Sequence, residues 1–332
     1  MNKYVGHPFQ TRGAEEYVLQ NGMGNGMRFL YIRNGLGLEV WISLDRAADL
    51  SRVIFKGDNF GFFSPSGYVS PTYYDRRDAE FLKSFTAGFC TTCGLTTVGG
   101  CDEDNGEYLP MHGTISNTPS ILNGIEETEE GITVKATVRD CRLFGNKLIL
   151  KRSYFISYKE NKIIMSDAVT NERDAETPFM VLYHCNMGYP LLTENSILKI
   201  PNHSMAGRDA HAKKYEDTAL IMEKPQARIP ECCFYYDVKE KNGLAHAGIF
   251  NKEIGKGTVF SYKKAELPYL TEWKMMGETD YVLGIEPGNC TPNGRKYHRE
   301  KGTLVTLSPG ETKTTGVTFD FLTDFEEFEN SF

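Results

Sequence analysis

Apolar and polar residues alternate along much of the chain with the two-residue period of a half-buried β-strand. The alternation is clearest over residues 132–139, where Ile, Val, Ala and Val are separated by Thr, Lys, Thr and Arg. Residues 148–158 and 163–171 are rich in β-forming side chains and flank the polar run Lys-Glu-Asn-Lys, which predicts a hairpin.

Further strand signals occur near both ends of the chain. Residues 37–43 and 52–57 are two apolar runs that flank a short polar segment. Residues 303–308 and 315–322 flank Pro309-Gly310-Glu311, and this turn sequence predicts another hairpin. The spacing of turn signals is typical of a β-sandwich.

Helix signals are few. Residues 75–85 carry acidic side chains early and apolar ones at Phe81, Leu82 and Phe85, which predicts one surface helix. No alternating strand–helix rhythm appears, and no Gly-x-Gly-x-x-Gly follows a strand, so dinucleotide and P-loop folds are unsupported. No Pro/Ser-rich linker divides the chain. We therefore expect an all-β protein, with residues 1–332 forming a single domain of two antiparallel sheets packed face to face.

Composition and charge narrow the possible partners. The 332 residues are 40% apolar and 12% aromatic, with a net charge of −7 and no basic stripe. Nucleic acid and anionic membrane surfaces are therefore not expected partners. The abundant aromatic side chains suit a β-rich protein and also suit sugar binding.

The N-terminal residues contain no apolar signal region, and no run of eighteen apolar residues occurs, so we expect a cytoplasmic protein without a membrane span. The eight cysteines are then expected as reduced thiols. Cys90 and Cys93 have the spacing of half a zinc site, but a second such pair and a suitably spaced His pair are missing. We interpret both as small buried hydrophobic residues, and expect no metal or other cofactor.

Polar residues stand out in three otherwise apolar or turn-forming stretches. His112 precedes Gly113 after Pro110-Met111. His184 and Asn186 lie two residues apart in a strand-like segment, and hence on one face of it. Glu286 ends the apolar run Tyr-Val-Leu-Gly-Ile beside a Pro-Gly turn, a common position for a working group on a rigid scaffold.

The order of short motifs resembles the aldose 1-epimerase superfamily of galactose mutarotase-like proteins, in a poorly characterised branch. The matching stretches span most of the chain and are LDRAADL, VIFKG, LPMHGTISNTPS, VLYHCNMGYPLL, EWKMMGETDYVLGIEPGN and LSPGET. The resemblance implies a large antiparallel β-supersandwich with a sugar site on one concave face. The substrate would be a small sugar.

The resemblance also assigns roles to residues. It implies Glu286, His184 and His112 as the catalytic groups. It implies sugar contacts from Arg46, Asp49, Lys56, Asn186, Trp273 and Arg295. Asp209 is a candidate for the aspartate that contacts sugar hydroxyls in this superfamily.

The implied reaction interconverts the α and β anomers of a free aldose. It needs one base at the C1 hydroxyl and one acid at the ring oxygen, and no cofactor. We assign Glu286 as the base on O1 and His184 as the acid on O5, because burial raises a glutamate pKa and histidine titrates near neutrality. His112 would steady the charge near the same oxygen.

Two alternatives stay open. A glycoside-processing enzyme would need a second carboxylate, for which the acidic cluster Asp102-Glu103-Asp104 is the candidate, although we interpret it as a solvated loop. A calcium loop in residues 102–107 is less favoured as a role for this cluster, because the acids are contiguous rather than alternating.

The second alternative is a carbohydrate sensor, which would keep the pocket and bind a sugar without turnover.

Overall fold

Two large antiparallel sheets form the protein, and the computed structural model describes residues 3–332 of it. The first sheet has eleven strands in the order β1-β2-β3-β4-β8-β16-β24-β23-β19-β18, with β5 paired to β4. Their bounds are β1 (Gly13–Val18), β2 (Arg28–Arg33), β3 (Leu38–Ser43), β4 (Asp49–Phe55), β5 (Asp58–Asn59), β8 (Cys90–Leu95), β16 (Met180–Met187), β18 (Asn202–Gly207), β19 (Cys232–Val238), β23 (Tyr269–Met276) and β24 (Tyr281–Gly288).

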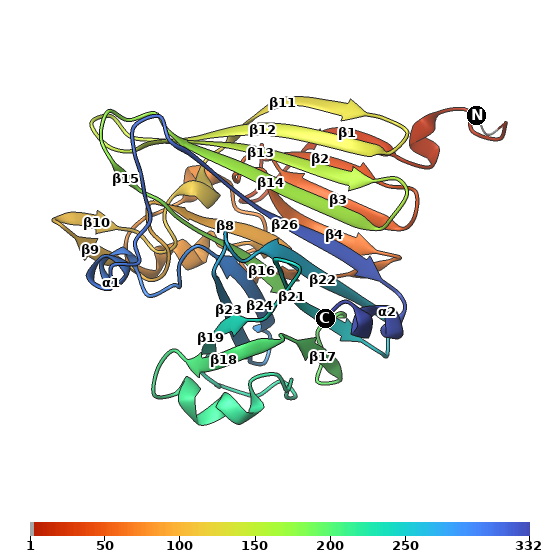
Figure 1. Cartoon of the computed structure of the whole chain (residues 1–332). Helices are drawn as coiled ribbons and strands as arrows, with labels where there is room; N and C mark the ends of the chain where they lie inside the picture. Colours follow the sequence, from red (N-terminus) through yellow and green to blue (C-terminus); the bar gives the residue numbers. More distant parts are fainter. Residues whose placement is uncertain (1–2) are drawn as a thin grey trace.

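The second sheet has nine strands in the order β11-β12-β13-β14-β26-β22-β21-β17, with β20 paired to β21. Their bounds are β11 (Ser120–Glu127), β12 (Gly131–Cys141), β13 (Lys147–Ser157), β14 (Lys162–Asn171), β17 (Ser196–Lys199), β20 (Glu240–Lys241), β21 (Leu244–Asn251), β22 (Lys256–Lys263) and β26 (Thr312–Leu322). The two sheets lie face to face, as Figure 1 shows.

The remaining elements are short. Three two-stranded pairs are formed by β6 (Phe62–Phe63) with β7 (Ala87–Gly88), β9 (Asp102–Asp104) with β10 (Glu107–Leu109), and β15 (Thr177–Pro178) with β25 (Thr306–Leu307). The helices are α1 (Arg295–Glu300), α2 (Phe325–Asn330) and the 3₁₀ helices η1 (Pro8–Gln10), η2 (Pro71–Tyr73), η3 (Asp78–Lys83), η4 (Ile115–Asn117) and η5 (Ala212–Thr218). None of the helices in the described residues is long and apolar enough to cross a bilayer.

Most strand predictions are confirmed. The alternating segment is β12, and β13 and β14 form the predicted hairpin around residues 158–161. The predicted hairpin on Pro309-Gly310 is wrong, because β25 pairs with β15 rather than with β26. The predicted surface helix over residues 75–85 is also wrong in type and length: it is the six-residue 3₁₀ helix η3, which buries Phe81.

The core between the sheets is apolar with one buried ionic network. Side chains that pack there include Leu30, Val40, Phe60, Phe89, Val134, Leu150 and Phe319. Within this layer Arg152 of β13 reaches across to Asp49 of β4, Nη1 to Oδ1 at 2.6 Å, and also pairs with Asp167 of β14 at 2.6 Å. Tyr183 of β16 donates a hydrogen bond to Asp167 at 2.7 Å. The network joins the two sheets behind the face that carries the site described below.

Candidate active site

A histidine and a glutamate face each other across two neighbouring strands of the first sheet. The register of β16 and β24 pairs Cys185 with Ile285 and Leu182 with Gly288, which places His184 opposite Glu286. His184 Nε2 lies 3.2 Å from Glu286 Oε1, and both side chains are buried. Oε1 has no hydrogen-bonding partner among the described residues, so the contact is close but not aligned as a hydrogen bond.

Gly284 makes room for the glutamate. A Cβ built at Gly284 would lie 2.3 Å from Glu286 Oε1 and 3.0 Å from Trp273 Cβ, so the carboxylate leans over this glycine. Trp273 of β23 pairs with Gly284 in the register and places its ring 5.2 Å from the His184 ring. Any side chain at residue 284 would displace the carboxylate, which explains a glycine within an apolar strand.

His112 enters the site from a turn. Its backbone has φ 54°, and its N–H donates to Gly99 O at 2.7 Å. Gly113 follows with φ 75°, and a Cβ there would lie 1.9 Å from Gly94 O. This close approach of two backbone segments fixes the His112 ring 5.6 Å from the His184 ring.

These groups line one cavity of about 320 Å³, a volume within the range of small-molecule sites. Phe85 closes it on one side, with its ring centroid 5.4 Å from that of His184. The remaining lining residues are Phe81, Leu82, Gly99, Gly100, Met111, Arg208, Cys233, Glu231, Thr271 and Pro292. The structure thus brings together His112, His184, Glu286 and Trp273, four residues far apart in the sequence.

Arg208 and Glu231 are lining residues that the sequence did not reveal. Arg208 Nη2 donates to Glu231 Oε1 at 3.0 Å, and the Trp273 indole donates to Glu231 Oε2 at 2.6 Å. Arg208 directly follows β18 and Glu231 directly precedes β19, and a charged side chain is common at the end of a strand. The one signal was the arginine of Met-Ala-Gly-Arg-Asp, beside the aspartate that we had singled out.

Burial sets the protonation of the site. It lowers the pKa of His184 to about 3, with a contribution from the nearby His112, and it lowers the pKa of His112 to about 4. Burial raises the pKa of Glu286 well above its ordinary value; the charge of Glu231 adds to this rise and Arg208 opposes it. The site therefore favours one proton on the Glu286 carboxyl beside a neutral His184.

The low pKa of His112 predicts a pH-dependent stability. Unfolded His112 takes up a proton near pH 6.5 and the folded residue only near 4, so the free energy of unfolding falls as pH drops through this window. The slope is at most about 1.4 kcal/mol per pH unit, because His112 takes up a single proton. His112→Asn removes the titration and tolerates a positive φ. Urea unfolding measured between pH 6.5 and 4 should show a smaller loss of unfolding free energy in the variant than in wild type. The same loss in both proteins would show that the His112 pKa is not lowered by folding.

Arg46 and Asp49, expected as sugar contacts, lie outside the cavity. The buried Arg46 guanidinium donates to the carbonyls of Val69 at 2.9 Å and Ser84 at 2.6 Å, and so supports the loops beneath the site. Asp49 accepts from Thr92 and Arg152 in the network between the sheets. Each of these two charged groups already has its partners within the protein.

Lys56 and Arg295 are also placed elsewhere. Lys56 is exposed in the turn between β4 and β5, and its carbonyl accepts from Lys256 Nζ at 2.8 Å. Arg295, at the start of α1, is buried and pairs with Asp104 and Glu107, each at 2.7 Å. Both were expected as sugar contacts, but Arg295 is paired within the protein and the Lys56 ammonium lies over the Phe55 ring, 5.6 Å from its centroid.

Asn186 and Asp209 lie beside the cavity without lining it. Asn186 shares the His184 face of β16 and is fully buried, and its Nδ2 donates to the His184 carbonyl at 2.8 Å. It therefore supports the strand that carries His184. Asp209 Oδ1 accepts from the backbone N–H groups of His211 and Ala212, each at 2.9 Å, and its Oδ2 lies 3.2 Å from Arg208 Nε.

The acidic cluster and the cysteine pair are not arranged as ligand sets. Asp104 of β9 pairs with Arg295 at 2.7 Å and with Arg299 at 2.8 Å, so two arginines of α1 balance its charge. Cys90 and Cys93 are three apart on β8, point to opposite faces, and belong to separate apolar clusters. Within residues 3–332, no group of three or more His, Cys, Asp or Glu side chains is placed to hold a metal ion.

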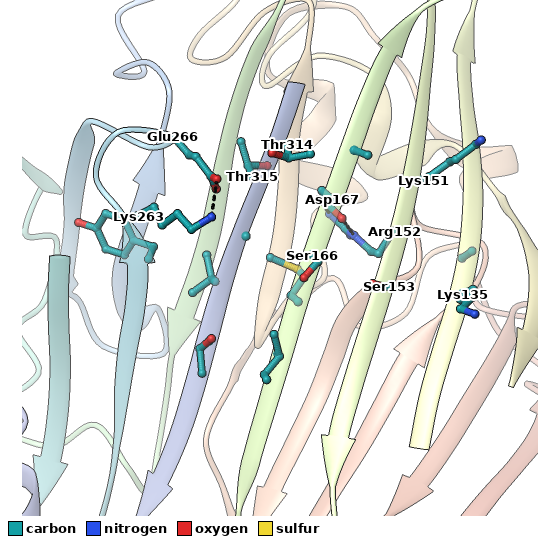
Figure 2. Close-up of a pocket in the computed structure, with 18 of the residues that line it drawn as sticks. Lys135, Lys151, Arg152, Ser153, Ser166, Asp167, Lys263, Glu266, Thr314 and Thr315 are labelled. Atoms are coloured by element: carbon teal, nitrogen blue, oxygen red, sulfur yellow. Dashed lines mark hydrogen bonds and ion pairs between the residues drawn. The ribbon is translucent and has the colours of Figure 1, made fainter. Parts of the chain in front are cut away.

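A larger hollow lies on the far side of the second sheet. Figure 2 shows it, about 740 Å³ and open, with Lys135, Lys151 and Lys263 around it and a Lys263–Glu266 ion pair at 3.0 Å. Its surface is otherwise mostly Ser, Thr and aliphatic side chains. It contains no His–Glu pair, so the smaller cavity on the first sheet is the candidate active site.

Solved structures share this arrangement of sheets, which is the fold of the galactose mutarotase-like proteins. A "putative aldose 1-epimerase" from Klebsiella pneumoniae is 24% identical with a TM-score of 0.88, over 96% of this chain and 85% of that one. A galactose mutarotase-like protein from Clostridium acetobutylicum is 17% identical with a TM-score of 0.68, over 94% and 99%. Galactose 1-epimerase from Lactobacillus acidophilus NCFM is 16% identical with a TM-score of 0.63, over 94% and 99%.

The chain belongs to the family described as "Domain of unknown function (DUF4432)", whose model matches residues 24–321. No curated protein matches the sequence. At these low identities the solved structures establish the fold, and the activity has to be argued from the site.

Proposed function

We propose that the protein is an aldose 1-epimerase-like isomerase that interconverts the α and β anomers of a free aldose. The observation that carries the proposal is the contact of 3.2 Å between His184 Nε2 and Glu286 Oε1 on the floor of a cavity. Anomer exchange requires one base at the C1 hydroxyl and one acid at the ring oxygen, and this pair can supply both.

In the proposed reaction, ring opening removes the proton from the C1 hydroxyl and adds one to the ring oxygen. Glu286 takes the proton from O1 and His184 gives one to O5, after the single proton of the pair has moved from the carboxyl to the imidazole. The C1–O5 bond breaks as the C1 carbonyl forms. The carbonyl then turns and the steps run in reverse, so the pair ends with the proton it began with. His112 donates a hydrogen bond near O5.

The rest of the cavity suits a monosaccharide. Trp273 and Phe85 offer apolar ring surfaces beside His184, against which the C–H face of a sugar packs. Thr271 pairs with Glu286 in the register and presents an unpartnered hydroxyl, Oγ1, for a sugar hydroxyl. All eight cysteines are unpaired, which supports a cytoplasmic location for the enzyme.

The test is anomer exchange measured by NMR on glucose, galactose and fucose, with and without the protein. We expect at least one sugar to exchange faster than in buffer. Exchange should decline in alkaline solution, where the pair loses its proton, and below about pH 4, where His112 and His184 also become protonated. A protein that binds a sugar and accelerates no exchange is a carbohydrate sensor, and the proposal then fails.

A further inference from the structure

Glu231 is a carboxylate that the proposed reaction does not use, yet it is fixed in the wall of the cavity. Its Oε1 accepts from Arg208 at 3.0 Å and its Oε2 accepts from the Trp273 indole at 2.6 Å. The side chain is 44% exposed, although two donors hold it in one orientation. The indole that holds Glu231 lies edge-to-face against the ring of the candidate acid His184, so the carboxylate is tied to the reactive part of the cavity.

Arg208 is the single Lys or Arg among the described residues that line the cavity. It faces two carboxylates, Glu231 at 3.0 Å and Asp209 at 3.2 Å. His112 and His184 are neutral near pH 7. Among the described lining residues Arg208 is therefore the one cation that an anionic ligand could use, and its charge is already compensated by Glu231 in the wall and by Asp209 beside the cavity.

Recognition of phosphate or carboxylate normally uses an arginine whose guanidinium fork is open to the ligand. Here a sugar phosphate would have to displace Glu231 from Arg208 or lie against its carboxylate, and like charges in contact are strongly unfavourable. Within residues 3–332 the other lining residues offer no second cation, and Phe81, Leu82, Phe85 and Met111 among them are apolar.

We propose that Glu231 is a specificity-determining residue: by occupying Arg208 it makes the site select uncharged aldoses and reject sugars that carry a phosphate or a carboxylate. This inference rests on the proposed function only in taking the cavity to be a sugar site. It concerns binding preference, and it stands or falls separately from turnover.

The test compares glucose with glucose 6-phosphate, and galactose with galacturonic acid, in wild type and in Glu231→Gln. Affinity is read from indole fluorescence, since Trp273 lines the cavity, and is confirmed by calorimetry. We expect wild type to bind each neutral sugar at least about tenfold more tightly than its anionic counterpart. The amide keeps an oxygen for the indole N–H and removes the charge. The ratio of neutral-sugar affinity to anionic-sugar affinity should therefore fall by about tenfold or more in the variant.

Two further variants make the result specific. Glu126→Gln removes the same charge from an exposed ion pair with Lys135 on the second sheet, and it should leave the ratio unchanged. Arg208→Gln combined with Glu231→Gln removes the freed cation and should cancel the gain for the anionic sugars. The rate of anomer exchange is measured in parallel, because the negative charge of Glu231 also raises the pKa of Glu286.

Several outcomes would overturn the inference. The wild type could bind anionic sugars as tightly as neutral ones, or bind neither. The ratio of neutral-sugar to anionic-sugar affinity could stay unchanged in Glu231→Gln, or the gain in affinity for anionic sugars could persist in the double variant. Absence of anomer exchange with the expected binding ratios would sink the proposed activity and leave the role of Glu231 supported.

Discussion

Glu286→Gln should lower kcat for anomer exchange by at least about a hundredfold, because general acid–base groups contribute about a hundred- to ten-thousand-fold in rate. The amide has the shape of the carboxyl and fits the space above Gly284, so sugar affinity should change far less. His184→Asn should behave similarly, since an amide is not a general acid near neutral pH. NMR exchange between the two anomers gives kcat, and sugar titration gives the affinity.

Glu272→Gln is the matched control for this prediction. Glu272 is a buried glutamate on the neighbouring strand β23, but it faces the opposite side of the sheet, where Tyr236 donates to its Oε2 at 2.6 Å. Burial raises the pKa of Glu272 to about 8, so the amide replaces a largely neutral acid. Its kcat should stay near that of wild type. An active wild type with an undiminished Glu286→Gln would show that Glu286 is not the base.

Local patterns predicted the strands well and their partners less well. Alternation located β12, and the polar run after Tyr158 located the β13–β14 hairpin, because neighbouring strands with a short turn pair with each other. The turn at Pro309-Gly310 has the same appearance. There β25 has only two residues and pairs with β15, whereas β26 pairs with β14 and β22. A turn sequence specifies a reversal of the chain, and tertiary packing decides the pairing.

The candidate site, like the pairing of strands, could be predicted only in part from the sequence. His184, Glu286 and His112 interrupt apolar or glycine-rich segments, so their polarity called for a partner that the local sequence did not supply. Asp49 was expected at the site from the resemblance alone, and the partner of this buried carboxylate is Arg152, 103 residues away in the other sheet. A buried polar residue therefore indicates an interaction, but not whether the partner is a ligand or the protein itself. Arg208 gave no such signal, because a charged residue between Gly207 and Asp209 is ordinary in a loop.

Arg152→Met should lower the free energy of unfolding by about 3–5 kcal/mol, because it leaves buried carboxylates without their counter-charge. Arg152 is fully buried and bonds Asp49 and Asp167 at 2.6 Å each. Burial raises the pKa of Asp49 even with Arg152 in place, so desolvation of this carboxylate is not fully offset. Guanidinium unfolding monitored by circular dichroism measures the change.

Arg139→Met is the matched control for the buried ion pair. Arg139 of β12 pairs with Glu172 at 3.1 Å, with the two side chains 55% and 48% exposed, and exposed ion pairs contribute about 0–1 kcal/mol. The triple variant Arg152→Met, Asp49→Asn, Asp167→Asn should recover part of the loss, because it removes the unpaired charges that cause it. An Arg152→Met protein within 1 kcal/mol of wild type would show that the network is solvated, and that the two sheets are held together by their apolar contacts alone.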